Sequence, residues 1–108
     1  MKRGEVWWVE FDPAINSEIT KLKFAIIVSN DSANRNLSRV VVIPVTSSTA
    51  RVFPGEALVK VGSQTRKAMA DQIIAADKSR LKNQIGSLSK ADLALVEHAM
   101  RVHLGLAI

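Results

Sequence analysis

The sequence contains no cysteine, which excludes a disulfide framework and thiolate metal sites. No apolar run approaches the ~20 residues that a membrane-spanning helix requires. The first five residues also lack the apolar stretch of a signal peptide. We therefore expect a cytoplasmic protein without a membrane partner. Because 108 residues suit one hydrophobic core, we expect a single domain over residues 1–108.

Several catalytic motifs are also missing. The chain has no Gly-rich phosphate loop, no His-x-x-x-His pair, no Gly-x-Ser-x-Gly elbow and no cluster of carboxylates. His98 and His103 are five positions apart on a predicted helix, so they do not share a face at metal-ligand spacing. Any reaction of this chain would have to proceed without a metal or a cofactor.

The charge balance is moderately positive. The 15 Lys and Arg residues exceed the 10 Asp and Glu residues, for a formal net charge of +5. This excess makes nucleic acid one hypothesis for a partner. Cleavage of RNA needs no metal, because the ribose 2′-hydroxyl supplies the nucleophile. The protein need only orient that hydroxyl, move protons and stabilise the charged phosphorane.

The strongest local pattern is a run of β-branched residues over 39–45 that ends in hydroxyl side chains over 46–49. Its length and composition predict a buried strand. The end of a rigid strand can hold a reactive group such as Thr46 in place. A polar turn after a core strand explains the same residues, so both interpretations stay open on this segment alone.

Other patterns predict a small β-rich fold. We expect strands over residues 4–11, 24–30, 56–61 and 68–74, a helical turn near 31–36 and another near 77–81. Ser89 as an N-cap, Asp92 in a capping box and Gly105 as a C-cap delimit a C-terminal helix. The expected fold class is therefore mainly β, with about five strands of a curved, mostly antiparallel sheet and one helix at the end.

Three polar segments leave their roles open. Residues 12–23 are too long for a hairpin connection, so they form either a surface excursion or a flap over a site. Residues 62–67 read as a basic hairpin loop. Asp71 and Gln72 interrupt the predicted strand 68–74, where an unpaired acid would be costly to bury. Asp71 is thus either functional or a structural acceptor of backbone hydrogen bonds.

Together, these motifs resemble the MazF/PemK (Kid) toxin family. The resemblance covers essentially the whole chain, and its motifs occur in order at residues 3–9, 12–13, 16–18, 25–31, 42–47, 70–73 and 77–81. It implies a homodimer of a small SH3-like curved antiparallel barrel. It also implies a toxin of a type II toxin–antitoxin system, with no cofactor, that is inhibited by a cognate MazE-like antitoxin with an acidic, flexible tail.

The activity implied by the resemblance is that of a metal-independent endoribonuclease, or mRNA interferase. Such enzymes cleave single-stranded RNA, often at a short sequence, and leave a 2′,3′-cyclic phosphate and a 5′-hydroxyl. Thr46 matches the catalytic threonine of the family and Asp71 matches an acid of some members. Lys23 stands where the family usually has Arg, so a point charge replaces a planar fork. The remaining expected RNA contacts are Asn16, Ser17, Glu18, Lys21, Ser47, Arg66, Lys67 and Gln72.

Two alternatives accompany this interpretation. The first is a non-catalytic, CcdB-like protein of the same architecture that binds gyrase. The ordered Pro-x-Thr and Asp-Gln motifs weigh against it. The second is a weakly active, degenerate member of the toxin family, a possibility that the replacement of Arg by Lys23 keeps open.

Overall fold

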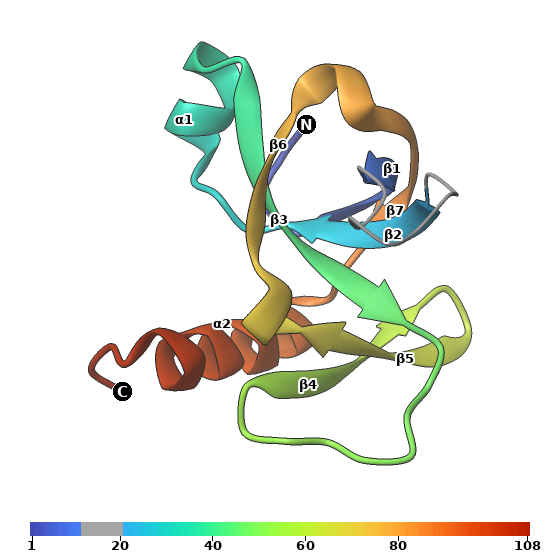
Figure 1. The fold of residues 1–108 in the computed structure, drawn as a ribbon, viewed down its shortest axis with the longest axis vertical. Coiled ribbons are helices and arrows are strands. Elements are labelled where there is room, and N and C mark those ends of the chain that lie inside the picture. The colour runs from blue at the N-terminus through green and yellow to red at the C-terminus, as the bar shows by residue number, and fades with distance from the viewer. Residues whose placement is uncertain (12–20) are drawn as a thin grey trace.

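The computed structural model describes residues 1–11 and 21–108, except the side chain of Lys21. Seven strands make up the sheet within these residues (Figure 1). Along the chain they are β1 (Glu5–Phe11), β2 (Lys21–Ile27), β3 (Arg39–Thr46), β4 (Glu56–Val61), β5 (Gln64–Met69), β6 (Ile74–Asp77) and β7 (Leu81–Ser87). The helices are α1 (Asp31–Asn36) and α2 (Lys90–Leu104), with short 3-10 turns at η1 (Ala70–Gln72) and η2 (Lys78–Arg80).

All of the strand pairs are antiparallel, in the order β4-β5-β3-β2-β1-β7, and β6 adds to the edge of β3. The expected mainly antiparallel fold with a C-terminal helix is confirmed. The path of paired strands ends at β4 and β7, so the sheet is not closed into a barrel. The expected number of strands was too low.

β3 is the strand around which the sheet bends. Its residues 42–44 pair with β2, whereas Val45 and Thr46 pair with β5. Pro44 lies where β3 changes partner, and it has no N–H to donate to a ladder. Figure 1 shows β3 crossing from the part of the sheet that holds β1, β2 and β6 to the part that holds β4 and β5.

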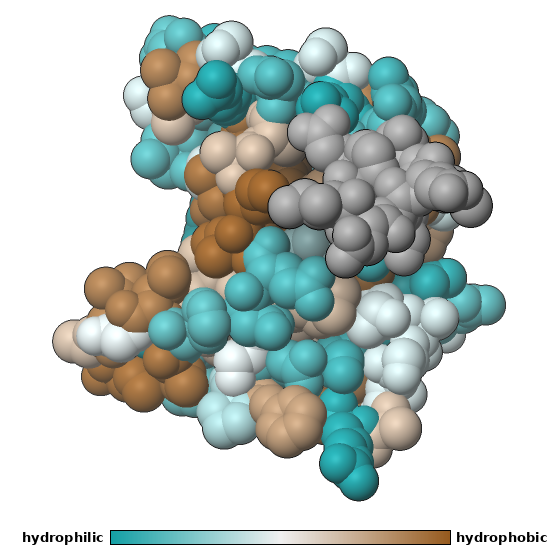
Figure 2. Space-filling view, in the orientation of Figure 1, coloured by the Kyte–Doolittle hydropathy of each residue, from teal (hydrophilic) through white to brown (hydrophobic). Residues whose placement is uncertain are grey.

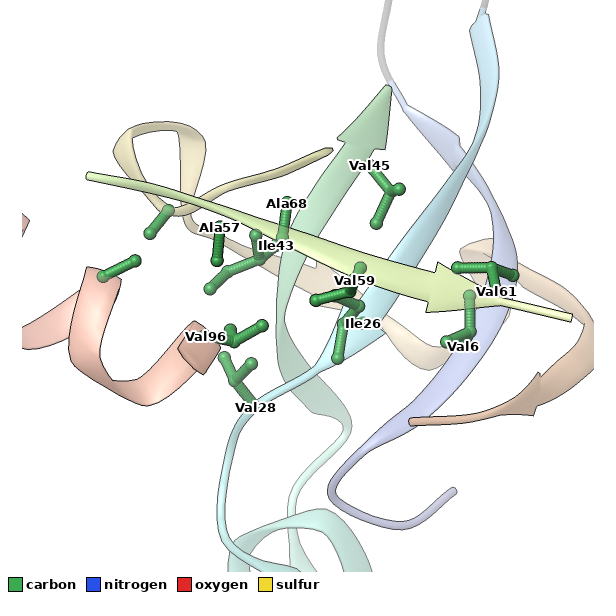
Figure 3. Close-up of a cluster of buried hydrophobic side chains, with 12 residues drawn as sticks. Val6, Ile26, Val28, Ile43, Val45, Ala57, Val59, Val61, Ala68 and Val96 are labelled. Atoms are coloured by element: carbon green, nitrogen blue, oxygen red, sulfur yellow. The ribbon is translucent and has the colours of Figure 1, made fainter. Parts of the chain in front are cut away.

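The curved sheet buries two hydrophobic clusters, one on each face of β1. Val6 belongs to a cluster with Ile26, Ile43 and Val59, which Figure 3 shows beside α2 and its Val96. Val9 is fully buried in the second cluster, against which Trp7 packs. Because successive side chains of a strand alternate between its faces, β1 carries apolar groups on both faces and is covered on both.

The C-terminal helix begins and ends where its capping residues predict. The Ser89 hydroxyl accepts a hydrogen bond from the Asp92 N–H, and Gly105 closes the helix in the left-handed region at φ 70°. Val96 and Ala99 bury the inner face of α2. No helix among the described residues is both long and apolar enough to cross a membrane.

The predicted strand over residues 68–74 is wrong. β5 ends at Met69, and the η1 turn over Ala70–Gln72 separates it from β6. The Ala70 N–H donates to the Gly55 carbonyl and the Ile73 N–H to the Ala70 carbonyl, so long-range and local bonds together close the turn. Asp71 and Gln72 are exposed there, and the burial cost that we expected for Asp71 does not arise.

The predicted basic loop over residues 62–67 is also wrong, because Arg66 and Lys67 lie within β5. Only Gly62 and Ser63 form the turn, with Gly62 at φ 64°. A two-residue hairpin commonly places glycine at such a position. β7 was not predicted, because its first residue, Leu81, is buried while most of the others are exposed and polar. It pairs along the edge of β1.

Candidate active site

A pocket of about 340 Å³ opens where β2, β3 and β5 meet. It brings together four of the residues expected to act on RNA, namely Lys23, Thr46, Ser47 and Arg66. The remaining lining comes from Trp8, Leu22, Phe24 and Val45. The site therefore combines two cationic side chains and two hydroxyls with an aromatic wall.

The pocket exists because β2 and β3 separate after a short ladder. Their last pair is Ala25 with Pro44, and the same register continued by two residues would set Lys23 opposite Thr46. Instead, the end of β3 pairs with β5, where Thr46 faces Lys67. The gap left between the two strands is lined by the side chains of Lys23 and Thr46.

Thr46 is the last residue of β3 and is half-buried. Its Oγ1 accepts a hydrogen bond from the Ser48 N–H at 3.3 Å. Since the hydroxyl oxygen is the acceptor in this bond, the hydroxyl proton remains available for donation to a ligand. Ser47, the next residue, is exposed at the mouth of the pocket.

Lys23 is also half-buried, and it makes no ion pair with any described residue. Its ammonium group is a compact charge with three N–H donors. Lys23 and Thr46 thus bring a positive charge and a neutral hydroxyl to the same pocket.

Arg66 completes the cationic side of the pocket and rests on an aromatic stack. Its guanidinium carbon lies 4.6 Å from the centre of the Phe24 ring. The Phe24 ring lies in turn 4.2 Å from the Trp8 ring, at 52° between planes. Nη2 of Arg66 donates to Oε1 of Gln64 at 3.0 Å. Nε is buried and has no hydrogen-bond partner in the described part of the chain.

Lys67 lies next to Arg66 on β5 but is engaged elsewhere. Its ammonium nitrogen lies 3.3 Å from Oε2 of Glu56 and donates to the Arg51 carbonyl at 2.9 Å. The two paired side chains are only 12% and 10% exposed. The ion pair with Glu56 and the bond to the Arg51 carbonyl hold the Lys67 ammonium elsewhere, whereas Arg66 lines the pocket.

The other expected site residues lie outside the pocket or outside the described residues. Asp71 and Gln72 are exposed in the η1 turn, beyond the end of β5, and neither lines the pocket. The side chain of Lys21, like the whole of Asn16, Ser17 and Glu18, belongs to the part that the structure does not describe. No three His, Cys, Asp or Glu side chains of residues 1–11 and 22–108 form a group that could hold a metal ion.

Sequence reasoning missed the aromatic wall. The structure separates the two tryptophans of β1. Trp7 packs against the second hydrophobic cluster, and Trp8 lines the pocket beside Phe24. The available signal was the position of Phe24 directly after Lys23, at the start of the predicted strand over residues 24–30.

Comparison with known families decides which group of proteins carries this site. Residues 2–104 match the model of the PemK-like, MazF-like toxin of type II toxin–antitoxin systems. The chain belongs to this family. The family resemblance of the sequence motifs is therefore confirmed, and the pocket described above is the candidate active site of a MazF-like toxin.

The relatives of this MazF-like chain are named endoribonucleases. Endoribonuclease MazF9 of Mycobacterium tuberculosis is 41% identical, over 98% of both chains. A solved structure entitled "Endoribonuclease in complex with its cognate antitoxin from Mycobacterial species" is 27% identical and has a TM-score of 0.83, covering 100% of this chain and 98% of its own. A second mycobacterial endoribonuclease is 25% identical with a TM-score of 0.84, covering 100% and 94%.

Proposed function

We propose that this protein is a metal-independent endoribonuclease toxin that cleaves single-stranded RNA at a short sequence. The observation that carries the proposal is the joint presence of Lys23, Thr46 and Arg66 in one pocket of a MazF-like fold. The relatives that span the whole chain support the reaction class, because they are named endoribonucleases. The three side chains supply charge and hydrogen bonds, which suits a substrate such as RNA that carries its own nucleophile.

In the proposed reaction, the ribose 2′-oxygen forms a bond to the adjacent phosphorus. The bond from phosphorus to the 5′-oxygen of the next nucleotide breaks. The 2′-hydroxyl loses its proton to water or hydroxide of the solvent and the 5′-oxygen gains one, so the products are a 2′,3′-cyclic phosphate and a 5′-hydroxyl. Thr46 donates a hydrogen bond to a non-bridging oxygen, and Lys23 stabilises the phosphorane or protonates the leaving oxygen.

The surrounding residues have secondary roles in the proposal. Ser47 lies at the mouth of the pocket, where its hydroxyl would contact the nucleotide next to the cleaved bond. Asp71, Gln72 and Lys67 stay as predicted positions, and a longer RNA segment that runs beyond the pocket would have to reach them. Trp8 gives the pocket an aromatic surface on which a base can stack.

The proposal is tested by incubating the purified protein with single-stranded RNA in EDTA and identifying the product ends. We expect cleavage with cyclic phosphate ends, and loss of cleavage in Thr46→Val and Lys23→Ala. A gyrase supercoiling assay run in parallel should show no inhibition. Inhibition of gyrase by a protein that leaves RNA intact would support the CcdB-like alternative instead.

We also propose a cognate antitoxin and a second copy of the chain as partners, in the cytoplasm. The solved relative in complex with its antitoxin supports the first, and the net charge of +5 suits an acidic tail. The second is supported by apolar side chains at the C-terminal end of α2 (Figure 2), where Leu104, Leu106 and Ile108 are exposed. Light scattering should give the mass of a dimer, and a monomer at micromolar concentration would contradict the proposed assembly.

A further inference from the structure

Among the described residues that line the pocket, Arg66 has a guanidinium that is held in place while one of its N–H donors has no acceptor. The Phe24 ring fixes its plane from one side, at 4.6 Å from the guanidinium carbon. The Gln64 side-chain oxygen accepts one N–H from Nη2. Nε is buried and finds no acceptor among the described residues. A buried donor without an acceptor is unfavourable, so the fold holds this arginine in place at a cost in stability, which points to a function for the N–H groups at its Nη atoms.

The geometry of these free donors selects the class of ligand. An arginine presents its N–H groups in a planar fork, which matches two oxygens of a phosphate or a carboxylate. Lys23 and Arg66 line the pocket together, and the described residues of the lining include no carboxylate to balance them. Thr46 adds a hydroxyl that can donate to the same anion. A phosphodiester fits this arrangement, because its two non-bridging oxygens need donors from more than one side.

We infer that Arg66 binds a non-bridging oxygen of the scissile phosphate through the remaining N–H groups of its two Nη atoms and stabilises the phosphorane in the transition state. Phe24 is then a positioning residue, since it holds the plane of the fork without touching the substrate phosphate. This inference rests on the proposed ribonuclease function and adds a catalytic residue to it. It gives the two cations different tasks: Lys23 supplies a point charge, and Arg66 supplies a planar fork held against Phe24.

The neighbouring cation shows what sets Arg66 apart. Lys67 is adjacent on β5, but Glu56 and the Arg51 carbonyl already satisfy its ammonium group. The charge of Lys67 is therefore paired within the fold. Arg66 has no acidic partner among the described side chains, although its Nε is as inaccessible to water as a core atom. This contrast separates a structural cation from one that is available to an anionic ligand.

The inference is tested by the steady-state kinetics of RNA cleavage by Arg66→Ala and Arg66→Lys. We expect kcat to fall about 10²–10³-fold in Arg66→Ala, the range found when one donor to a developing anion is removed. Arg66→Lys keeps the charge but loses the fork, so its kcat should fall at least tenfold. KM should change much less than kcat in both. Full kcat with a raised KM would place Arg66 on a distant phosphate and overturn the inference.

A sulfur substitution in the RNA reports on the contact itself. Replacement of the non-bridging oxygen that Arg66 contacts by sulfur should slow the parent enzyme, and Arg66→Ala should show little of this slowing. A merely structural role of Arg66 would leave the sulfur effect unchanged, which would contradict the inference. Phe24→Leu should lower kcat in the parent but add nothing in Arg66→Ala, because the ring acts through the arginine.

Arg39→Ala is the matched control. It removes the same charge from the opposite end of β3, seven residues from Thr46, a separation of roughly 23 Å in a strand. Its activity should stay within twofold of the parent. Failure of the parent to cut RNA would remove the proposed function as a whole. Loss of cleavage in Thr46→Val combined with full cleavage in Arg66→Ala would remove only the role given to Arg66.

Discussion

Replacement of Thr46 by valine should abolish most of the activity while leaving the fold almost unchanged. Valine keeps the branched shape and the β preference of threonine and removes only the hydroxyl. In the structure, this hydroxyl makes one hydrogen bond, at 3.3 Å to the exposed Ser48 N–H. Loss of a bond of this kind costs about 1 kcal/mol or less. The melting temperature should therefore fall by only a few degrees, given about 4–8 °C per kcal/mol for a domain of this size.

The effect on catalysis should be much larger. A hydroxyl that donates to the developing charge of the phosphorane is comparable to one oxyanion-hole donor, whose removal costs about 10²–10³-fold in kcat, or about 2.7–4 kcal/mol. The expected loss in transition-state stabilisation thus exceeds the expected loss in folding stability at least twofold. This separation is what distinguishes a reacting hydroxyl from a polar turn after a core strand.

The assay is single-turnover cleavage of a fluorescent single-stranded RNA in EDTA, combined with thermal unfolding of each variant. Thr46→Ser should retain activity within about tenfold, because it restores the hydroxyl. Ser48→Ala is the control, since it removes a hydroxyl two residues from Thr46 that does not line the pocket. Cleavage by Thr46→Val within about fivefold of the parent would refute the role given to Thr46. A large drop in melting temperature would show that the hydroxyl instead supports the fold.

Three further variants probe the charges of the molecule. Lys23→Ala should lower kcat and reduce the slope of log affinity against log salt by about one phosphate contact, whereas an unchanged slope in a filter-binding titration would argue against its contact with RNA. Lys67→Ala should destabilise the fold by about 2–4 kcal/mol in urea, because it leaves the nearly buried Glu56 carboxylate without its ion partner; a change below about 0.5 kcal/mol would contradict this. The Arg3 backbone N–H, which donates to Asp31 at 2.8 Å, lowers the pKa of that carboxyl below its ordinary value of 3.8. A carboxyl whose pKa is lower in the folded state stabilises the fold above its unfolded-state pKa, and this contribution disappears as the pH falls through its folded-state pKa. Asp31→Ala should therefore be less stable than the parent at pH 7 and equally stable at strongly acidic pH. A stability difference that does not change with pH would contradict this.

Local rules predicted the elements whose signals do not depend on distant partners. The α2 helix follows from Ser89, Asp92 and Gly105, which act within a few residues of each end. Side chains alternate between the two faces of a strand, and this puts Val6 of β1 on one face and Val9 on the other. The same rules placed Thr46 at the end of β3, because β-branched residues stop there.

Long-range pairing decided the elements that were wrong or missed. The apolar residues on both sides of Asp71 and Gln72 fit a strand equally well. The turn depends in part on the long-range bond from the Ala70 N–H to the Gly55 carbonyl. β7 has a polar exterior, and it forms because the edge of β1 offers it hydrogen bonds. Arg66 could be listed as a cation from sequence, but its orientation depends on the register of β5.

The departure of β3 from β2 has the widest consequences. It opens the pocket between Lys23 and Thr46, and it lets Arg66 reach the ring of Phe24 from a strand on the far side of β3. No short-range pattern contains this information, because the change of partner at Pro44 involves three strands. The site was therefore predictable in its residues at the ends of strands, but not in its aromatic wall or in the separate tasks of its cations.

The central claim is that the RNA itself supplies the nucleophile and that this pocket accelerates its attack without a metal. Mass spectrometry of the product ends, from RNA cut in EDTA, tests this claim most directly. The account predicts a 2′,3′-cyclic phosphate and a 5′-hydroxyl, and no cleavage when the nucleotide before the cut carries a single 2′-deoxy substitution. Products with a 3′-hydroxyl and a 5′-phosphate, or cleavage of the deoxy-substituted RNA, would contradict it.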